Sequence, residues 1–211
     1  MSNPFPPQAS ALIQDIRSCT RCALHLNRKQ AVPGTGPIPC TVAAIGEKIA
    51  GAEDTQGIPF VGPAGAYLNS LLSAIGLNRD EIYITNITRC RVPDGQDPTF
   101  EQIQTCTNAY LYAQLNMINP LLILTFGRYS TGLFFGGKIT DLQGQPRHHL
   151  GRIFLPTFHP AAVLHNPSLG PALRASFDLI PSLLQQAKTL NPNELQPFTP
   201  PTPLPAQLNL F

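Results

Sequence analysis

Three loops of this sequence carry side chains that could do chemistry. Gly46-Glu47-Lys48 follows a short apolar run, Asn86 ends a second run, and His159 follows another. A carboxylate can position a water molecule, an amide can read the edge of a planar ligand, and an imidazole can donate to a developing oxyanion. A lone Asn or His is usually structural, but several such loops at one edge of a parallel sheet indicate a binding or catalytic site.

The cysteines form a second candidate site. Cys19 and Cys22 make a C-x2-C pair, and Cys90 and Cys106 are separated by 15 residues. Four thiolates can hold a zinc ion or an iron–sulfur cluster, and the spacing leaves both open. Cys40, which precedes an apolar run, is interpreted as a small buried residue.

Apolar runs alternate with helical patterns along the chain. This order predicts an α/β fold, a three-layer α/β/α sandwich around a central four-stranded, mainly parallel sheet. Strands are expected at 41–46, 81–85, 121–126 and 152–156, and helices at 64–75, 99–117, 127–135 and 171–188.

Composition limits the class of protein. Of 211 residues, 43% are apolar and only 12% are charged, so a buried core is expected. No apolar run approaches the ~20 residues of a membrane span, and no signal peptide is visible, which favours a cytoplasmic protein. The formal net charge of +2 does not by itself announce a nucleic-acid-binding protein.

The 23 prolines concentrate at the two ends of the chain. We therefore expect a flexible N-terminus over 1–7, one folded domain over 8–190, and an extended Pro-rich tail over 191–211.

Over about residues 10–185 the chain resembles the family-4 uracil-DNA glycosylases, the iron–sulfur members of the uracil-DNA glycosylase superfamily. The matching segments are the cysteine spacing, Gly46-Glu47 with Glu53-Asp54, Gly57 and Pro59-Phe60-Val61-Gly62, Thr85-Asn86 through Cys90-Arg91, and Pro156-Thr157-Phe158-His159-Pro160-Ala161. The resemblance implies a [4Fe–4S] cluster held by Cys19, Cys22, Cys90 and Cys106.

The resemblance also implies an activity. Such an enzyme flips uracil out of DNA and hydrolyses its N-glycosidic bond, which leaves an abasic site and initiates base excision repair. By similarity, Phe60 stacks on the flipped base, Asn86 reads its edge, His159 donates to uracil O2, and Glu47 positions the hydrolytic water.

One loop departs from the family pattern. The family usually has Gly-Glu-Ala-Pro-Gly where this chain has Gly46-Glu47-Lys48-Ile49-Ala50. The proline that stiffens the loop is absent. We expect Gly46 and Lys48 to belong to the substrate-binding site. Lys48 could pair with Glu47 and hold it ionised, or point at solvent or a DNA phosphate.

Val163 and Leu164 occupy the place where the family inserts a wedge into the duplex. The alternative is that both are ordinary apolar residues at the start of a helix.

The last five residues form a further motif. Gln207-Leu208-Asn209-Leu210-Phe211 resembles the pentapeptide by which bacterial repair proteins dock on the β sliding clamp. Leu208, Leu210 and Phe211 offer apolar groups to pockets, Gln207 offers an amide, and the Pro-rich segment acts as a spacer. The alternative is an apolar end that folds back on the domain.

Three functions stay open at this point. The first is a monomeric uracil-DNA glycosylase with a structural cluster. The second is a clamp-tethered iron–sulfur DNA-binding paralogue that has lost or altered its excision activity through the changed loop. The third is a structural protein that holds zinc.

Overall fold

The computed structural model describes residues 6–93 and 96–200 and contains a five-stranded sheet in the order β2-β1-β3-β5-β4. The strands are β1 (Val42–Gly46), β2 (Tyr83–Asn86), β3 (Leu122–Phe126), β4 (Arg147–His149) and β5 (Arg152–Thr157). The first three and β5 are mutually parallel, which confirms the predicted α/β sheet, whereas β4 pairs antiparallel with β5.

The predicted strand number was therefore one too low. Strand β4 is a three-residue edge strand of polar residues, so it lacks the apolar pattern by which a strand is recognised. A tight turn at Leu150-Gly151, with φ of 54° and 72°, joins it to β5.

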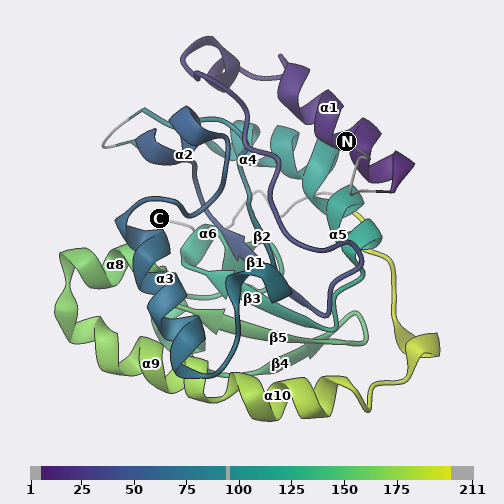
Figure 1. The fold of residues 1–211 in the computed structure, drawn as a ribbon, viewed down its shortest axis with the longest axis vertical. Helices are drawn as coiled ribbons and strands as arrows, with labels where there is room; N and C mark the ends of the chain where they lie inside the picture. The colour runs from purple at the N-terminus through teal and green to yellow at the C-terminus, as the bar shows by residue number, and fades with distance from the viewer. Residues whose placement is uncertain (1–5, 94–95, 201–211) are drawn as a thin grey trace.

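Helices cover both faces of the sheet, as expected of a three-layer sandwich (Figure 1). One face packs against α3 (Pro63–Ala74), α8 (Pro160–His165), α9 (Gly170–Asp178) and α10 (Ile180–Ala187). The other packs against α4 (Phe100–Cys106), α5 (Tyr112–Ile118) and α6 (Arg128–Gly132). The remaining α-helices among the described residues are α1 (Pro7–Ser18), α2 (Gly51–Gln56) and α7 (Ile139–Leu142).

Two predicted helices are interrupted. A π-helical turn at Thr107–Leu111 separates α4 from α5, directly after Cys106. The prediction of a helix over 171–188 misses a break at Leu179 between α9 and α10. Pro181 explains the second break, because a proline has no N–H to donate to the preceding helical turn.

The segment expected to form a free tail from residue 191 begins inside the folded body. Phe198 is 2% exposed in the second core cluster. The side chain of Asn116 donates to the Phe198 carbonyl at 2.9 Å and accepts from the Phe198 N–H at 2.8 Å. The Arg152 guanidinium lies 4.4 Å from the centre of the Phe198 ring. These contacts extend the described fold beyond the expected boundary at 190.

Residues 207–211, which carry the clamp-binding motif, lie outside the described residues. No helix within residues 6–93 and 96–200 is both long and apolar enough to cross a membrane.

Candidate active site

The carboxyl ends of the parallel strands place the predicted site residues at one edge of the sheet. They surround a cavity of about 320 Å³. Its lining comprises Glu47, Lys48, Ala50, Glu53, Phe60, Ala64, Asn86, His159, Ala161 and His165. The loops selected from the sequence therefore meet in space.

Phe60 forms one wall of the cavity, and its backbone is held in an unusual conformation. Its φ is +53°, and the residue is only 5% exposed. Arg79 donates to the Phe60 carbonyl at 2.9 Å and also to the Pro59 carbonyl. A Cβ on Gly65 would come within 1.8 Å of the Phe60 carbonyl oxygen, so only glycine fits there.

Gly46 allows the ring of Phe60 and the amide of Asn86 to share this cavity. Gly46 lies opposite Asn86 in the β1–β2 ladder. A Cβ on Gly46 would come within 2.3 Å of Asn86 Oδ1 and 2.6 Å of Phe60 Cε2. The absence of a side chain at Gly46 thus leaves room for the Asn86 amide and the Phe60 ring.

His159 lies at the N-terminal end of α8 and is held as a neutral hydrogen-bond donor. Its Nδ1 accepts from the Ala161 N–H at 3.1 Å, which leaves Nε2 to carry the proton. Burial lowers the pKa of His159 to about 4. Its ring stacks on Phe60, with ring centres 5.4 Å apart and planes inclined by 21°.

Glu47 contributes a carboxylate to the cavity. Its Oε1 accepts from the Tyr129 N–H at 2.8 Å, at the start of α6. Burial raises the pKa of Glu47 to about 7, although the Tyr129 N–H opposes that shift. A Cβ on Gly127 would approach Glu47 Oε1 within 2.4 Å, so the carboxylate packs directly on the backbone.

Lys48 does not pair with Glu47 as one reading of the sequence expected. Its Nζ donates to the Gln96 carbonyl at 2.7 Å and lies 3.3 Å from Asp97 Oδ1. Asp97 could not be selected from the sequence, because it belongs to a segment with neither motif nor periodicity.

Glu53 also lines the cavity, although its motif match did not single it out as a site residue. Its Oε1 accepts from the Gly62 N–H at 3.4 Å. Arg79 is a second residue that sequence reasoning missed, because its contacts are with carbonyl groups distant along the chain.

The two wedge candidates have different environments. Val163 is 8% exposed and packs in the first core cluster, which favours the alternative that it is an ordinary apolar residue of the helix. Leu164 is 48% exposed and remains available to contact a duplex.

The four cysteines of the second candidate site gather around a third, smaller hydrophobic cluster. Cys90 and Cys106 are buried in it, and Cys19 and Cys22 pack against it. All four are free thiols. Cys40 is buried elsewhere, in the second core cluster, in agreement with its structural interpretation.

Cationic groups face these thiols. Arg28 donates to Cys90 Sγ at 2.9 Å, and the fully buried Arg89 faces Cys106. Burial raises the pKa of Cys106 to about 12, and the charge of Arg89 opposes this shift. Among residues 6–93 and 96–200, no group of three or more His, Cys, Asp or Glu side chains is arranged to hold a metal ion.

Comparison with known proteins agrees with this geometry. The family model for the Uracil DNA glycosylase superfamily matches residues 33–185, and the chain therefore belongs to that superfamily. The chain is 40% identical over 157 residues to the type-4 uracil-DNA glycosylase of Thermotoga maritima. This alignment covers 72% of the present chain and 81% of the relative. It is 34% identical over 184 residues to the type-4 uracil-DNA glycosylase of Archaeoglobus fulgidus, and this alignment covers 82% of the present chain and 91% of the relative. Within the superfamily the chain groups with the type-4 enzymes, which confirms the resemblance seen in its motifs.

The close approach at Gly46 can be tested by adding a single methyl group. We expect Gly46→Ala to slow uracil excision by roughly 100-fold, because the new Cβ displaces both the Phe60 ring and the Asn86 amide. The rate is measured with a uracil-containing oligonucleotide under single-turnover conditions. Gly136→Ala is the matched control, because a Cβ there meets no atom of the described residues within 4 Å. Equal rates for the two variants would contradict the role of Gly46.

Proposed function

We propose that this chain excises uracil from DNA by hydrolysing its N-glycosidic bond, with Phe60, Asn86, His159 and Glu47 as the working residues. The observation that carries the proposal is the convergence of these four side chains on one cavity of about 320 Å³. A glycosylase of this superfamily must hold a flipped nucleotide outside the base stack, and a single concave site serves that purpose.

Phe60 and Asn86 bind and select the base. The Phe60 ring, fixed by Arg79 and Gly65, offers a flat apolar surface for stacking. The Asn86 amide donates to uracil O4 and accepts from N3–H, whereas cytosine presents the opposite pattern. A mispaired buried amide costs on the order of 1–3 kcal/mol, and this penalty disfavours cytosine.

His159 and Glu47 act on the bond that breaks. As uracil leaves, negative charge develops on its O2, and Nε2–H of the neutral His159 donates to that oxygen. On the sugar side, positive charge develops at C1′. The ionised Glu47 positions the attacking water and faces this charge. The low pKa of His159 keeps it a neutral donor throughout the neutral pH range.

The changed loop does not remove Glu47 from the cavity. The alternative function, an inactive DNA-binding paralogue, was suggested by the changed sequence of that loop. Because Glu47 still lines the cavity, that alternative is not favoured. Lys48 lies at the rim of the cavity, with its ammonium directed at Asp97.

The proposed function is tested most directly at the base-reading amide. Asn86→Asp is expected to lose uracil excision or to accept cytosine, because a carboxylate cannot donate to O4. Release of each base from matched oligonucleotides is measured by alkaline cleavage at the abasic site. The exposed Asn193→Asp is the control and keeps wild-type selectivity. Unchanged, uracil-only excision by Asn86→Asp would contradict the assignment.

Cys19, Cys22, Cys90 and Cys106 are proposed to hold a [4Fe–4S] cluster. Support comes from the donor set, which is four free thiols around one apolar cluster with Arg28 donating to a sulfur. When bound, such a cluster would link the N-terminal segment, through Cys19 and Cys22, to the loop after β2 and to α4, through Cys90 and Cys106. Within the chain, the buried Arg89 offsets the negative charge of the thiolates and donates to the Asn86 carbonyl, so this site adjoins the base reader.

If the four cysteines hold a cluster, replacing one of them should remove bound iron, whereas replacing Cys40 should not. Cys106→Ser is expected to lose the brown colour and most of the bound iron, since it removes one of the four ligands. Cys40→Ser, the matched control, is expected to keep both, because Cys40 lies in another core cluster. Visible absorbance and iron analysis of the purified protein measure the outcome. A colourless wild-type protein containing zinc would overturn the proposal.

The terminal peptide is proposed to bind a β-type sliding clamp through Gln207, Leu208, Leu210 and Phe211. The proposal is supported by the sequence motif itself. In addition, the chain is held to the folded domain at Phe198, nine residues before Gln207.

Deleting residues 207–211 is therefore expected to abolish binding to the clamp and to leave excision on naked oligonucleotides unchanged. Both are measured on the same preparation, by clamp pull-down and by the excision assay. Retention of clamp binding by the truncated protein would contradict the proposal.

A further inference from the structure

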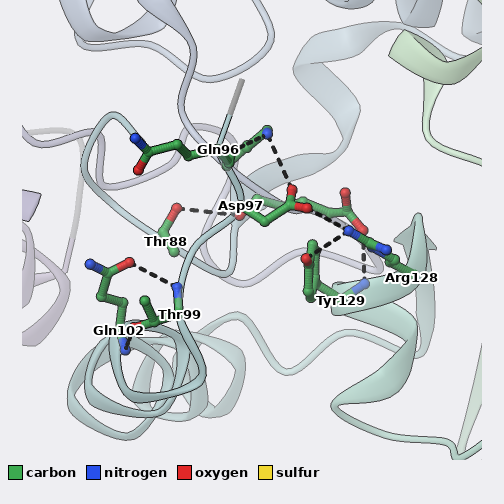
Figure 2. Close-up of polar contacts among 9 residues, drawn as sticks. Thr88, Gln96, Asp97, Thr99, Gln102, Arg128 and Tyr129 are labelled. Atoms are coloured by element: carbon green, nitrogen blue, oxygen red, sulfur yellow. Dashed lines mark hydrogen bonds and ion pairs between the residues drawn. The ribbon is translucent and has the colours of Figure 1, made fainter. Parts of the chain in front are cut away.

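The loop that departs from the family pattern is tied to two other segments by ionic contacts. Lys48 Nζ donates to the Gln96 carbonyl at 2.7 Å and lies 3.3 Å from Asp97 Oδ1. Arg128, the first residue of α6, approaches Asp97 Oδ2 at 2.5 Å. One carboxylate thus receives a different cation on each oxygen, as the close-up shows for Asp97 and Arg128 (Figure 2). We call Lys48, Asp97 and Arg128 the ion triad.

The ion triad is connected to Glu47 by short contacts. Arg128 donates to the Tyr129 hydroxyl at 2.8 Å, and its guanidinium lies 4.6 Å from the centre of that ring. The Tyr129 N–H in turn donates to Glu47 Oε1 at 2.8 Å. Thr88 donates from its N–H to the Glu47 carbonyl at 3.2 Å and fixes the backbone from the β2 side.

The exposure of the ion triad limits its contribution to folding stability. Its side chains are 40%, 42% and 43% exposed, and isolated pairs at such exposure add little to folding stability. Their effect on a nearby buried charge is larger, because Glu47 is poorly solvated. The triad is therefore better suited to controlling Glu47 than to stabilising the fold.

Charged groups from three segments face Glu47. Lys48 in its own loop and Arg128 in α6 lower its pKa, whereas Asp97 raises it. Glu53 and His165 line the same cavity as Glu47, and Tyr129 and His159 also lie close to it. Burial raises the pKa of Tyr129 to about 12, and burial lowers that of His159 to about 4, so neither changes charge near pH 7.

We propose that the Lys48–Asp97–Arg128 triad is a positioning device for Glu47, which replaces the stiff family loop and balances the charge around the carboxylate. The inference rests on the proposed role of Glu47 in excision. Asp97 is its central residue, because it contacts both Lys48, in the loop after β1, and Arg128, in α6. Lys48 is a positioning residue on this account and needs no contact with the substrate.

The test is the pH dependence of single-turnover excision by two variants that change opposite charges. In the wild-type enzyme the rate is expected to rise with pH around 7, as Glu47 ionises. Asp97→Asn removes a negative charge, so the rise moves to lower pH by about half a unit. Lys48→Met removes a positive charge, so the rise moves to higher pH by about as much. Both variants also lose several-fold in maximal rate, because the loop is less well fixed.

Controls separate charge from positioning and from folding. The exposed Asp141→Asn and Lys188→Met make the same charge changes elsewhere and are expected to keep the wild-type midpoint. Lys48→Arg restores the cation and is expected to restore the midpoint. Circular dichroism establishes that each variant is folded.

Two results would overturn the inference. One is a slower rate in Asp97→Asn and Lys48→Met with no change of midpoint, which indicates a merely structural contact. The other is a shift of both midpoints in the same direction. If the wild-type protein excises no uracil at any pH, the proposed function fails. The titration of the Glu47 carboxyl, followed by NMR in the same variants, then tests the triad independently.

Discussion

The missing side chain at Gly46 is the constraint on which the rest of the site depends. The residue ends β1 directly opposite Asn86, and the Phe60 ring lies against the same point. A parallel sheet brings its strand ends together, but it does not by itself make room for a planar ligand between them. The absence of a Cβ lets an aromatic wall and a buried amide face one cavity, and Gly65 likewise leaves space for the Phe60 carbonyl.

Burial then has opposite effects on Glu47 and His159, two of the titratable residues that line the cavity. The same loss of solvent raises the pKa of Glu47 to about 7 and lowers that of His159 to about 4. His159 is thereby a neutral donor, while Glu47 changes charge within the physiological range and depends on its surroundings. The formal net charge of the chain is only +2, so the protein as a whole attracts the DNA backbone weakly. The charged side chains close to Glu47 therefore matter more for the reaction than the net charge does.

The sequence predicted the parts of this structure that leave a local pattern. Buried strands and the helix at 64–75 have clear apolar periodicity, and Phe60, Asn86 and His159 belong to contiguous motifs. Strand β4 was missed because it is short and polar, and the packing of Phe198 was missed because prolines around it suggested a free tail. Asp97 and Arg79 act through partners distant in sequence, so only the folded chain reveals them.

On the structure described here, this cavity selects uracil and breaks its bond to the sugar. The most direct measurement compares two oligonucleotides that differ only in carrying uracil or cytosine at one position, each incubated with the purified full-length protein and then cleaved with alkali. We expect cleavage at the uracil position alone. An intact uracil strand, or equal cleavage of both strands, would contradict it.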